Sequence, residues 1–309
     1  MAQFPVMAVN ISDALRLPPG PVDLRTHASS STPHAPGDKK RTRAIRSEQE
    51  PALADLQERL YAEHSRRILL VLQGMDTSGK GGVIKHVVGM LNPQGCQIVS
   101  FKKPTEQELG RHFLWRIRRG LPLRGMVGVF DRSHYEDVLI ARVHELAEPE
   151  TIERRYAEIN RFEQRLIADG ITLVKCFLHI SAERQEERLL ARLDDPTKHW
   201  KFNPGDVDER RRWADYQRAY ELALERCNTE QGPWYVVPSD RKWYRNWAIG
   251  QLLLETLTGL DPEYPPVDFD VEQQRRRLIA GPGKRVRPVP GRRFDHGLSP
   301  PFSGGRTER

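Results

Sequence analysis

A glycine-rich segment that carries one aspartate and one lysine has the residue types and spacing of a phosphate-binding loop. Residues 74–80 read Gly-Met-Asp-Thr-Ser-Gly-Lys and match the pattern GxxxxGK. In such a loop, backbone N–H groups cradle phosphate oxygens, and the N-terminus of the following helix adds a partial positive charge. Lys80 would reach the terminal phosphates as a point charge. The segment therefore predicts binding and transfer of phosphoryl groups.

Two positions in this loop differ from the common pattern and change the expected metal site. Gly81 follows Lys80, where a Ser or Thr usually binds Mg²⁺, and Asp76 lies inside the loop. Phosphate repels a carboxylate unless a cation lies between them, so we expect Asp76 to help hold Mg²⁺, with Mn²⁺ as an alternative. The other interpretation is that Asp76 only caps the following turn.

A second acidic residue follows an apolar run farther along the chain. Residues 126–131 end in Asp131, and Arg132 comes directly after it. A carboxylate at the end of a parallel strand faces the same edge of the sheet as the glycine-rich loop, so we expect Asp131 to be the second metal-holding residue. Arg132 can grip a phosphate with two parallel hydrogen bonds. Ser133 and Glu136 have capping-box spacing, and we interpret Glu136 as a capping partner rather than a catalytic base.

The rest of the sequence alternates short apolar runs with segments of helical spacing. Strands are expected at 67–73, 97–101, 126–131, 171–180 and 234–237. Helices are expected at 48–63, 83–91, 105–119, 133–143, 150–169 and 240–258, with another that Ser181 caps. Apolar strands separated by helices predict an α/β fold with three layers, in which helices cover both faces of a five-stranded parallel sheet. The long charged stretch 194–231 is expected to form an inserted helical lid.

The charge is concentrated near the two ends of the chain. The net charge is +7, from 49 Lys and Arg against 42 Asp and Glu. Residues 1–46 carry a net +4 and residues 271–309 a net +7, so the stretch between them is slightly acidic. We therefore expect a flexible N-terminal extension at 1–46, a catalytic domain at 47–265 and a basic, Pro- and Arg-rich tail at 266–309. The tails lack interleaved aromatic residues, which favours a solvated surface over an arm that binds nucleic acid.

Composition and cysteine spacing exclude several classes of protein. A charged fraction of 29% and a hydrophobic fraction of 38% argue against both a membrane protein and a wholly disordered chain. We expect no transmembrane helix and no secretory signal. The three cysteines, Cys96, Cys176 and Cys227, are far apart and show no CxxC spacing, which argues against a disulfide framework and a zinc site. A reduced, cytoplasmic protein fits best.

Taken together, six segments resemble the polyphosphate kinase 2 family. They are residues 74–82, 101–105 (Phe-Lys-Lys-Pro-Thr), 130–137 (Phe-Asp-Arg-Ser-His-Tyr-Glu-Asp), 192–201 (Arg-Leu-Asp-Asp-Pro-Thr-Lys-His-Trp-Lys), 233–238 (Pro-Trp-Tyr-Val-Val-Pro) and 242–245 (Lys-Trp-Tyr-Arg). The resemblance covers about residues 50–265. It implies a P-loop kinase fold that moves phosphate between inorganic polyphosphate and a nucleotide, with Mg²⁺. Residues 133–137 are similar to members that accept AMP, some of which also accept ADP.

The resemblance, together with the charge pattern, gives a set of expected site residues. The expected catalytic residues are Asp76, Lys80, Asp131, Arg132 and Arg192. The expected phosphate-binding residues are Gly74, Thr77, Ser78, Gly79, Lys80, Gly81, Gly82, Lys102, Lys103, Arg132 and Lys198. The expected metal ligands are Asp76 and Asp131. The expected partners are inorganic polyphosphate, AMP or ADP, with guanine nucleotides as a further option, and other copies of the chain in a homo-oligomer; no membrane or nucleic acid is expected.

We expect direct in-line transfer without a phosphohistidine, because an AMP phosphate is already ionised at neutral pH and needs no strong general base. Two alternatives stay open at this point. An ATP-dependent nucleotide or nucleoside kinase could use the same loop. A nucleotide-regulated module could instead bind nucleic acid through the basic tails.

Overall fold

The centre of the structure is a five-stranded, fully parallel β-sheet. We describe residues 10–280 of a computed structural model. The strands are β1 (Arg67–Gln73), β2 (Cys96–Ser100), β3 (Val127–Asp131), β4 (Ile171–His179) and β5 (Trp234–Pro238), in the spatial order β2-β3-β1-β4-β5. β1 lies in the middle, with Leu72 opposite Asp131 of β3 and Cys176 of β4. The predicted α/β fold and the five parallel strands are confirmed.

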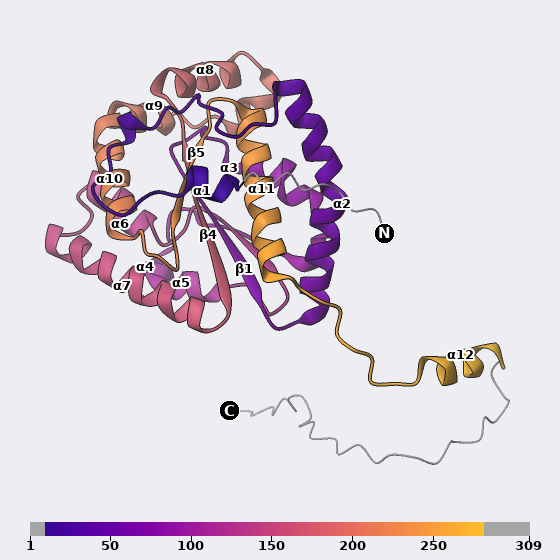
Figure 1. The fold of residues 1–309 in the computed structure, drawn as a ribbon. Helices are drawn as coiled ribbons and strands as arrows, with labels where there is room; N and C mark the ends of the chain where they lie inside the picture. The colour runs from indigo at the N-terminus through magenta and orange to yellow at the C-terminus, as the bar shows by residue number, and fades with distance from the viewer. Residues whose placement is uncertain (1–9, 281–309) are drawn as a thin grey trace. The chain divides into compact units, whose positions relative to one another are not determined.

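Helices cover both faces of the sheet, because successive side chains of each buried strand point to opposite faces. On β1, Leu69 and Val71 pack into one apolar cluster, whereas Leu70 and Leu72 pack into the other. One face is covered by α5 (Leu114–Arg119), α6 (Glu136–Val143), α7 (Pro149–Ala168) and α10 (Trp213–Arg226). The other is covered by α1 (Ile11–Leu15), α2 (Lys39–Glu63), α3 (Lys80–His86) and α11 (Lys242–Leu260), with α2 and α11 side by side (Figure 1).

Several helices differ in extent from the sequence prediction. The helix expected at 105–119 is two helices, because the chain turns at Gly110; α4 (Glu106–Leu109) keeps the predicted Thr105–Glu108 capping box. The helix after the glycine-rich loop ends at His86 and gives way to a 3-10 turn at Val88–Met90. Ser181 caps α8 (Ala182–Leu193) as predicted.

The predicted Ser133–Glu136 capping box is wrong. α6 begins at Glu136 with Tyr135 at its N-cap, and no side chain caps it. Ser133 is fully buried and bonds to the Gln73 side chain instead, so its hydroxyl serves the strand-end loop rather than the helix.

The flexible extension expected at 1–46 needs correction for the residues that the structure describes. Ile11, Leu15, Leu17, Val22 and Leu24 are all buried, since this segment crosses the sheet edge and both apolar clusters. Leu17 N–H donates to the Trp234 carbonyl at 2.8 Å. α2 then begins at Lys39, earlier than expected, with Asp38 as its N-cap. The Pro and Ser content of the segment suggested flexibility, whereas its spaced apolar residues join it to the core.

The inserted lid expected at 194–231 is shorter in the structure. A 3-10 helix (Pro196–Lys201) and α9 (Gly205–Arg211) follow α8 and have no buried residues. α10 (Trp213–Arg226), in contrast, is part of the core, because Ala219, Tyr220 and Leu224 pack against the sheet side. We therefore use the name lid segment for residues 194–212 only.

The chain divides into two compact units at Pro265 and Pro266. Within the second unit, α12 (Val271–Ile279) is a short helix with no buried residues, capped by the Asp270 side chain. The rest of the predicted basic tail, residues 281–309, lies outside the described residues. Among residues 10–280, no helix is both long and apolar enough to cross a membrane.

Candidate active site

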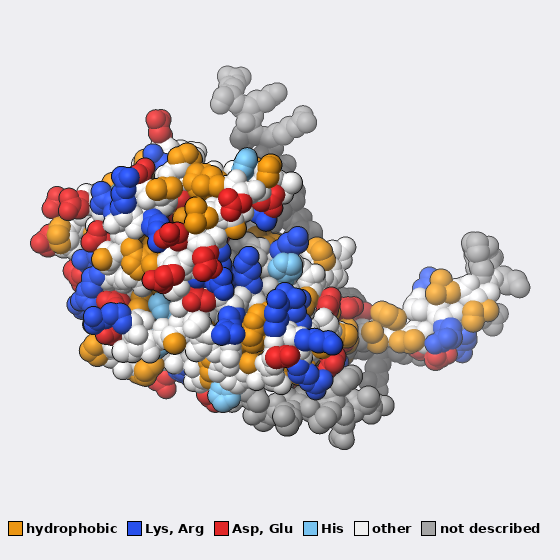
Figure 2. All heavy atoms as spheres, turned by 90° about the horizontal axis from the view of Figure 1, so that it is seen from above, with side chains coloured by type: hydrophobic (Ala, Val, Ile, Leu, Met, Phe, Trp, Pro, Cys, Tyr) orange, Lys and Arg blue, Asp and Glu red, His pale blue; other side chains and the backbone are white. Residues whose placement is uncertain are grey.

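A polar cavity of about 320 Å³ lies at the carboxyl ends of β1 and β3. All five residues predicted to be catalytic line it, although three different parts of the chain supply them. The lining residues are Asp76, Thr77, Lys80, Gly81, Asp131, Arg132, Arg192, Lys201, Asn203 and Asp206. In Figure 2, which shows the molecule from above the view of Figure 1, Lys and Arg side chains gather near the middle of the face with carboxylates beside them.

The loop between β1 and α3 presents backbone N–H groups that have no acceptor among the described residues. This holds for Asp76, Thr77 and Gly79, whereas the Ser78 N–H donates to the Met75 carbonyl at 3.0 Å. Thr77 and Gly79 have positive φ angles of 62° and 113°, which turn successive peptide units to form the loop. Free N–H groups ahead of a helix can bind an anionic ligand.

Lys80 is held against this loop from below. Its side chain is only 7% exposed, and Nζ donates to the Gly74 carbonyl at 2.6 Å. Burial lowers the pKa of Lys80, and the nearby Arg132 guanidinium lowers it further. The carboxylates of Asp76, Asp131 and Glu136 favour its charged form. A buried ammonium in a water-poor site interacts strongly with a phosphate that enters the cavity.

The two predicted metal ligands face the same cavity but are engaged differently. Asp76 Oδ1 accepts a hydrogen bond from Arg132 Nη2 at 2.8 Å, in an ion pair that is about one-third exposed. Asp131 Oδ1 is buried and has no hydrogen-bond partner among the described residues. An unsatisfied buried carboxylate oxygen is costly unless a ligand binds it. Two carboxylates with hard oxygen donors fit a Mg²⁺ ion whose other ligands are water and phosphate.

Arg192 reaches the cavity from the last turn of α8, directly before the lid segment. Arg192 Nη1 donates to the Lys201 carbonyl at 2.9 Å and lies 3.4 Å from Asp206 Oδ2. Burial and the Asp76 carboxylate raise the pKa of Asp206, whereas Arg192 opposes this. Arg192 therefore already has a carboxylate partner, Asp206, which a phosphate could replace.

Other predicted phosphate-binding residues do not line the cavity. Lys102 and Lys103 are exposed beyond β2, and Lys198 forms an exposed ion pair with Asp195 at 2.5 Å. Gly74, Ser78, Gly79 and Gly82 shape the loop from behind rather than line the cavity. The structure thus divides the predicted set into an inner group at the cavity and cations farther out.

Glu136 has a different place from the predicted one, and Asn203 and Asp206 line the cavity beside Lys201, which ends the motif at 192–201. Glu136 lies beside Lys80 and Arg132; burial raises its pKa, and those two cations oppose the rise. The Gln73 amide donates to Glu136 Oε1 at 3.0 Å. Lys201, Asn203 and Asp206 also line the cavity. The motif Arg-Leu-Asp-Asp-Pro through Lys201 pointed to this segment, but no spacing rule identified Asp206.

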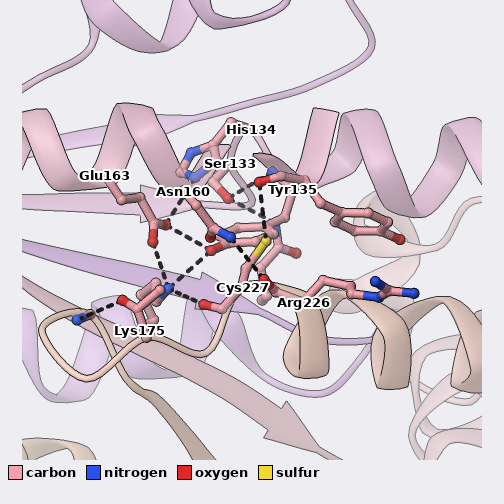
Figure 3. Close-up of polar contacts among 12 residues, drawn as sticks. Ser133, His134, Tyr135, Asn160, Glu163, Lys175, Arg226 and Cys227 are labelled. Atoms are coloured by element: carbon pink, nitrogen blue, oxygen red, sulfur yellow. Dashed lines mark hydrogen bonds and ion pairs between the residues drawn. The ribbon is translucent and has the colours of Figure 1, made fainter. Parts of the chain in front are cut away.

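A buried polar network anchors the loop that carries Arg132 (Figure 3). Glu163 of α7 accepts a hydrogen bond from the Tyr135 hydroxyl at 2.7 Å and contacts His134 Nε2 at 3.2 Å. Lys175 of β4 pairs with Glu163 at 2.6 Å and donates to the Cys227 carbonyl at 2.8 Å. Both Lys175 and Glu163 are buried. Since Arg132 has a positive φ of 63°, this network holds a backbone conformation that the loop would not adopt unaided.

Comparison with known proteins gives matches over most of the chain. A family model described as polyphosphate kinase 2 matches residues 37–265. An AMP/ADP-polyphosphate phosphotransferase of Meiothermus ruber is 49% identical over 213 residues, 69% of this chain and 80% of that protein. An ADP-polyphosphate phosphotransferase of Rhodopseudomonas palustris is 44% identical over 243 residues, 74% and 84% of the two chains. The crystal structure of a polyphosphate kinase 2 from Arthrobacter aurescens TC1 is 49% identical, with a TM-score of 0.85 over 88% of this chain and 97% of that one.

Proposed function

Because the chain belongs to the polyphosphate kinase 2 family, we propose that it is a phosphotransferase that moves a phosphoryl group between inorganic polyphosphate and AMP or ADP. The observation that carries the proposal is the meeting of Asp76, Lys80, Asp131, Arg132 and Arg192 at one cavity. A phosphoryl transfer needs positioning and neutralisation of charge more than covalent chemistry. The cavity offers both, through free N–H groups and four cations, Lys80, Arg132, Arg192 and Lys201.

The cavity residues would have different roles, according to where they lie. Lys80 and Arg132 lie on the loop side and would stabilise the charge on the transferred phosphoryl group. Arg192 would reach the same group from the end of α8, where a phosphate would take the place of Asp206 as its partner. Asp76 and Asp131 would hold Mg²⁺, which neutralises phosphate charge when bound. Closing of the lid segment over the cavity would exclude water and limit hydrolysis.

The acceptor is inferred from the strand-end loop and from similarity. Residues 133–137 (Ser-His-Tyr-Glu-Asp) resemble family members that accept AMP. The relative from Meiothermus ruber is named for both AMP and ADP, which supports use of either nucleotide by this chain. We infer AMP as the first acceptor and ADP as the second. An ATP-dependent kinase is the less favoured alternative, since the matching relatives are named for polyphosphate.

The deciding experiment incubates the purified chain with long-chain polyphosphate, Mg²⁺ and each of AMP, ADP, GMP and GDP, and separates the products. A parallel series replaces polyphosphate with ATP as donor. We expect ADP from AMP with polyphosphate as donor, and no product when Mg²⁺ is replaced by a chelator. Transfer from ATP but not from polyphosphate would contradict the proposal.

Assembly and location stay predictions. The resemblance implies a cytoplasmic homo-oligomer. Light scattering coupled to size-exclusion chromatography measures the number of copies, and fractionation of the producing cells tests the location.

A further inference from the structure

Arg245 is a buried cation without a carboxylate partner, directly behind the glycine-rich loop. It lies in α11 and is 2% exposed. Its Nη1 donates to the Ser78 carbonyl at 2.9 Å, and Nε and Nη2 donate to Asn246 Oδ1 at 3.2 and 2.8 Å. Within residues 10–280, no Asp or Glu pairs with it, and the charged group that acts on it is another arginine, Arg188. Burying an ionised group without a countercharge is costly, so a partner is expected elsewhere.

Two glycines of the loop let the guanidinium approach. A Cβ atom at Gly79 would lie 1.7 Å from Arg245 Nη1, and one at Gly82 would lie 2.6 Å from Nη2. Neither position could carry a side chain without moving Arg245. The contact with Arg245 therefore explains why positions 79 and 82 are glycine, and the turn is a second reason at Gly79. The loop and Arg245 fit together as one unit.

Arg188 of α8 reinforces the same contact from another side. Its guanidinium donates to the carbonyls of Thr77 at 2.8 Å and Ser78 at 3.1 Å, and also to those of Ser239 and Asp240. The Ser78 carbonyl thus accepts hydrogen bonds from two guanidinium groups. Burial and, to a smaller extent, the Arg188 charge together lower the pKa of Arg245 to about 9, as expected for a cation whose countercharge is missing.

The Ser78 carbonyl and the Gly79 N–H belong to one peptide unit. The Gly79 N–H has no acceptor among the described residues. Hydrogen bonds to a carbonyl polarise the peptide and strengthen the N–H as a donor. Arg245 thereby strengthens the attraction between the Gly79 N–H and an anion on the cavity side of the loop.

We propose that Arg245 is the countercharge of a phosphate anion held by the glycine-rich loop, and that it acts through the Ser78–Gly79 peptide without touching the substrate. It is therefore a positioning residue, and its positive charge is what matters. The inference rests on the proposed function, since it requires that the loop binds phosphate. It goes beyond that function by assigning the Lys242–Arg245 motif an electrostatic role at the phosphate site.

The test compares the full-length wild type with Arg245→Gln, Arg245→Met and Arg245→Lys. Arg124→Gln is the matched control, because it removes one exposed cation near the opposite ends of the strands, close to Asp169. Calorimetry measures binding of inorganic tripolyphosphate at fixed Mg²⁺, and thermal unfolding is recorded without ligand. We expect the two neutral variants to bind about tenfold or more weakly, and Arg245→Lys within about threefold of wild type. The Arg124→Gln variant should bind like wild type.

The unliganded melting temperatures separate this role from a structural one. A buried cation that lacks a countercharge weakens the empty protein, so the neutral variants should melt no lower than wild type. Equal binding by Arg245→Gln, Arg245→Lys and wild type would overturn the inference while leaving the proposed function intact. So would failure of both neutral variants to fold while Arg245→Lys folds. Absence of tripolyphosphate binding by wild type would overturn the proposed function itself, and the inference with it.

Discussion

At the residue scale, acidic and basic side chains form pairs in the cavity, and a bound phosphate would compete for the basic partners. Asp76 pairs with Arg132, and Asp206 lies near Arg192. Each arginine is thereby kept in place and partly neutralised before any phosphate enters. The pairs also limit the repulsion among Lys80, Arg132 and Arg192, which share a small volume. A phosphate and a divalent cation entering together would satisfy both sets of charges at once.

Replacement of Asp76 by Asn should reduce transfer by about 10²–10³-fold or more, because a carboxylate that offsets Arg132 and holds the metal is lost. Replacement of Lys80 by Ala should have an effect of similar size. Initial rates with polyphosphate and AMP measure both. Asp55→Asn is the control, since that carboxylate forms a half-exposed ion pair with Arg59 on α2. Near-normal rates in both site variants would show that the reaction takes place elsewhere.

Two neighbouring glycines should respond differently to alanine. Gly79→Ala places a methyl group against Arg245 at a φ of 113°, and we expect a loss of more than about 2 kcal/mol in the free energy of unfolding. Gly81 has open space around its position and no positive φ, so Gly81→Ala should change stability by less than about 0.5 kcal/mol. Urea unfolding of the two variants checks this, and equal losses would contradict it.

The inner site could be predicted where one short segment carries the signal. Asp76 and Lys80 follow from the loop pattern, and Asp131 and Arg132 follow from their place at the end of a strand. Arg188 and Arg245 could not be recognised in this way, because their contacts to the loop join residues more than 100 positions apart. The role of Glu136 was misassigned because a local spacing rule was applied to a residue that tertiary contacts control.

At the element scale, the β3–α6 connection is held by elements that are remote in sequence. α7 supplies Glu163, β4 supplies Lys175 and the end of α10 supplies the Cys227 carbonyl (Figure 3). Burial would raise the pKa of Glu163, but the Lys175 charge and the His134 hydrogen bond outweigh this and lower it. The network therefore keeps an ion pair in the core next to the loop that carries Arg132.

Breaking this pair should destabilise the protein in a pH-dependent way. Glu163→Gln leaves Lys175 buried and unpaired, which should cost about 3–5 kcal/mol at neutral pH. Because the folded-state pKa of Glu163 is lowered, its contribution is complete above the ordinary carboxyl pKa and is lost as the pH falls through the lowered value. The difference from wild type, measured by urea unfolding, should shrink on acidification.

A double variant and a control make this prediction specific. Glu163→Gln combined with Lys175→Met should recover part of the loss, since no charge is then left unpaired. Glu153→Gln removes a partly exposed carboxylate that pairs with Arg142 and lies 3.9 Å from Arg226, and it should cost less than about 1 kcal/mol. Equal stability of Glu163→Gln and wild type would contradict the role of the network.

Most elements could be predicted because the sheet is parallel and buried on both faces. Strands β1, β3, β4 and β5 are mostly buried apolar runs, and all five strands begin and end within a residue of the prediction. Helix ends were less predictable. The break at Gly110 and the assignment of α10 to the core depend on packing between distant segments, which periodicity does not encode.

At the scale of the whole molecule, the N-terminal region differs from what its composition suggests, whereas residues 266–280 do not. The N-terminal segment has a Pro- and Ser-rich composition, yet its few apolar side chains complete the core. Residues 266–280 contribute no buried side chain. Basic charge alone was a poor guide to which end is part of the folded unit.

Truncations should separate the two ends. Removal of residues 1–24 takes away five buried apolar side chains, each worth about 1.5–3 kcal/mol, which approaches the whole stability of a typical domain. We expect that variant to be unfolded or to melt far below wild type by circular dichroism. Removal of residues 271–309 should leave melting temperature and turnover unchanged. Loss of turnover on that deletion would favour the nucleic-acid-binding alternative.

The short bridge between Arg16 and Tyr235 has a consequence for encounters with other chains. It places an antiparallel segment along β5, so that border of the sheet is already occupied. The opposite border is β2, a five-residue strand with Ile98 half exposed. A strand added beside β5 would have to displace this segment, whereas β2 has a strand neighbour on one side only, β3.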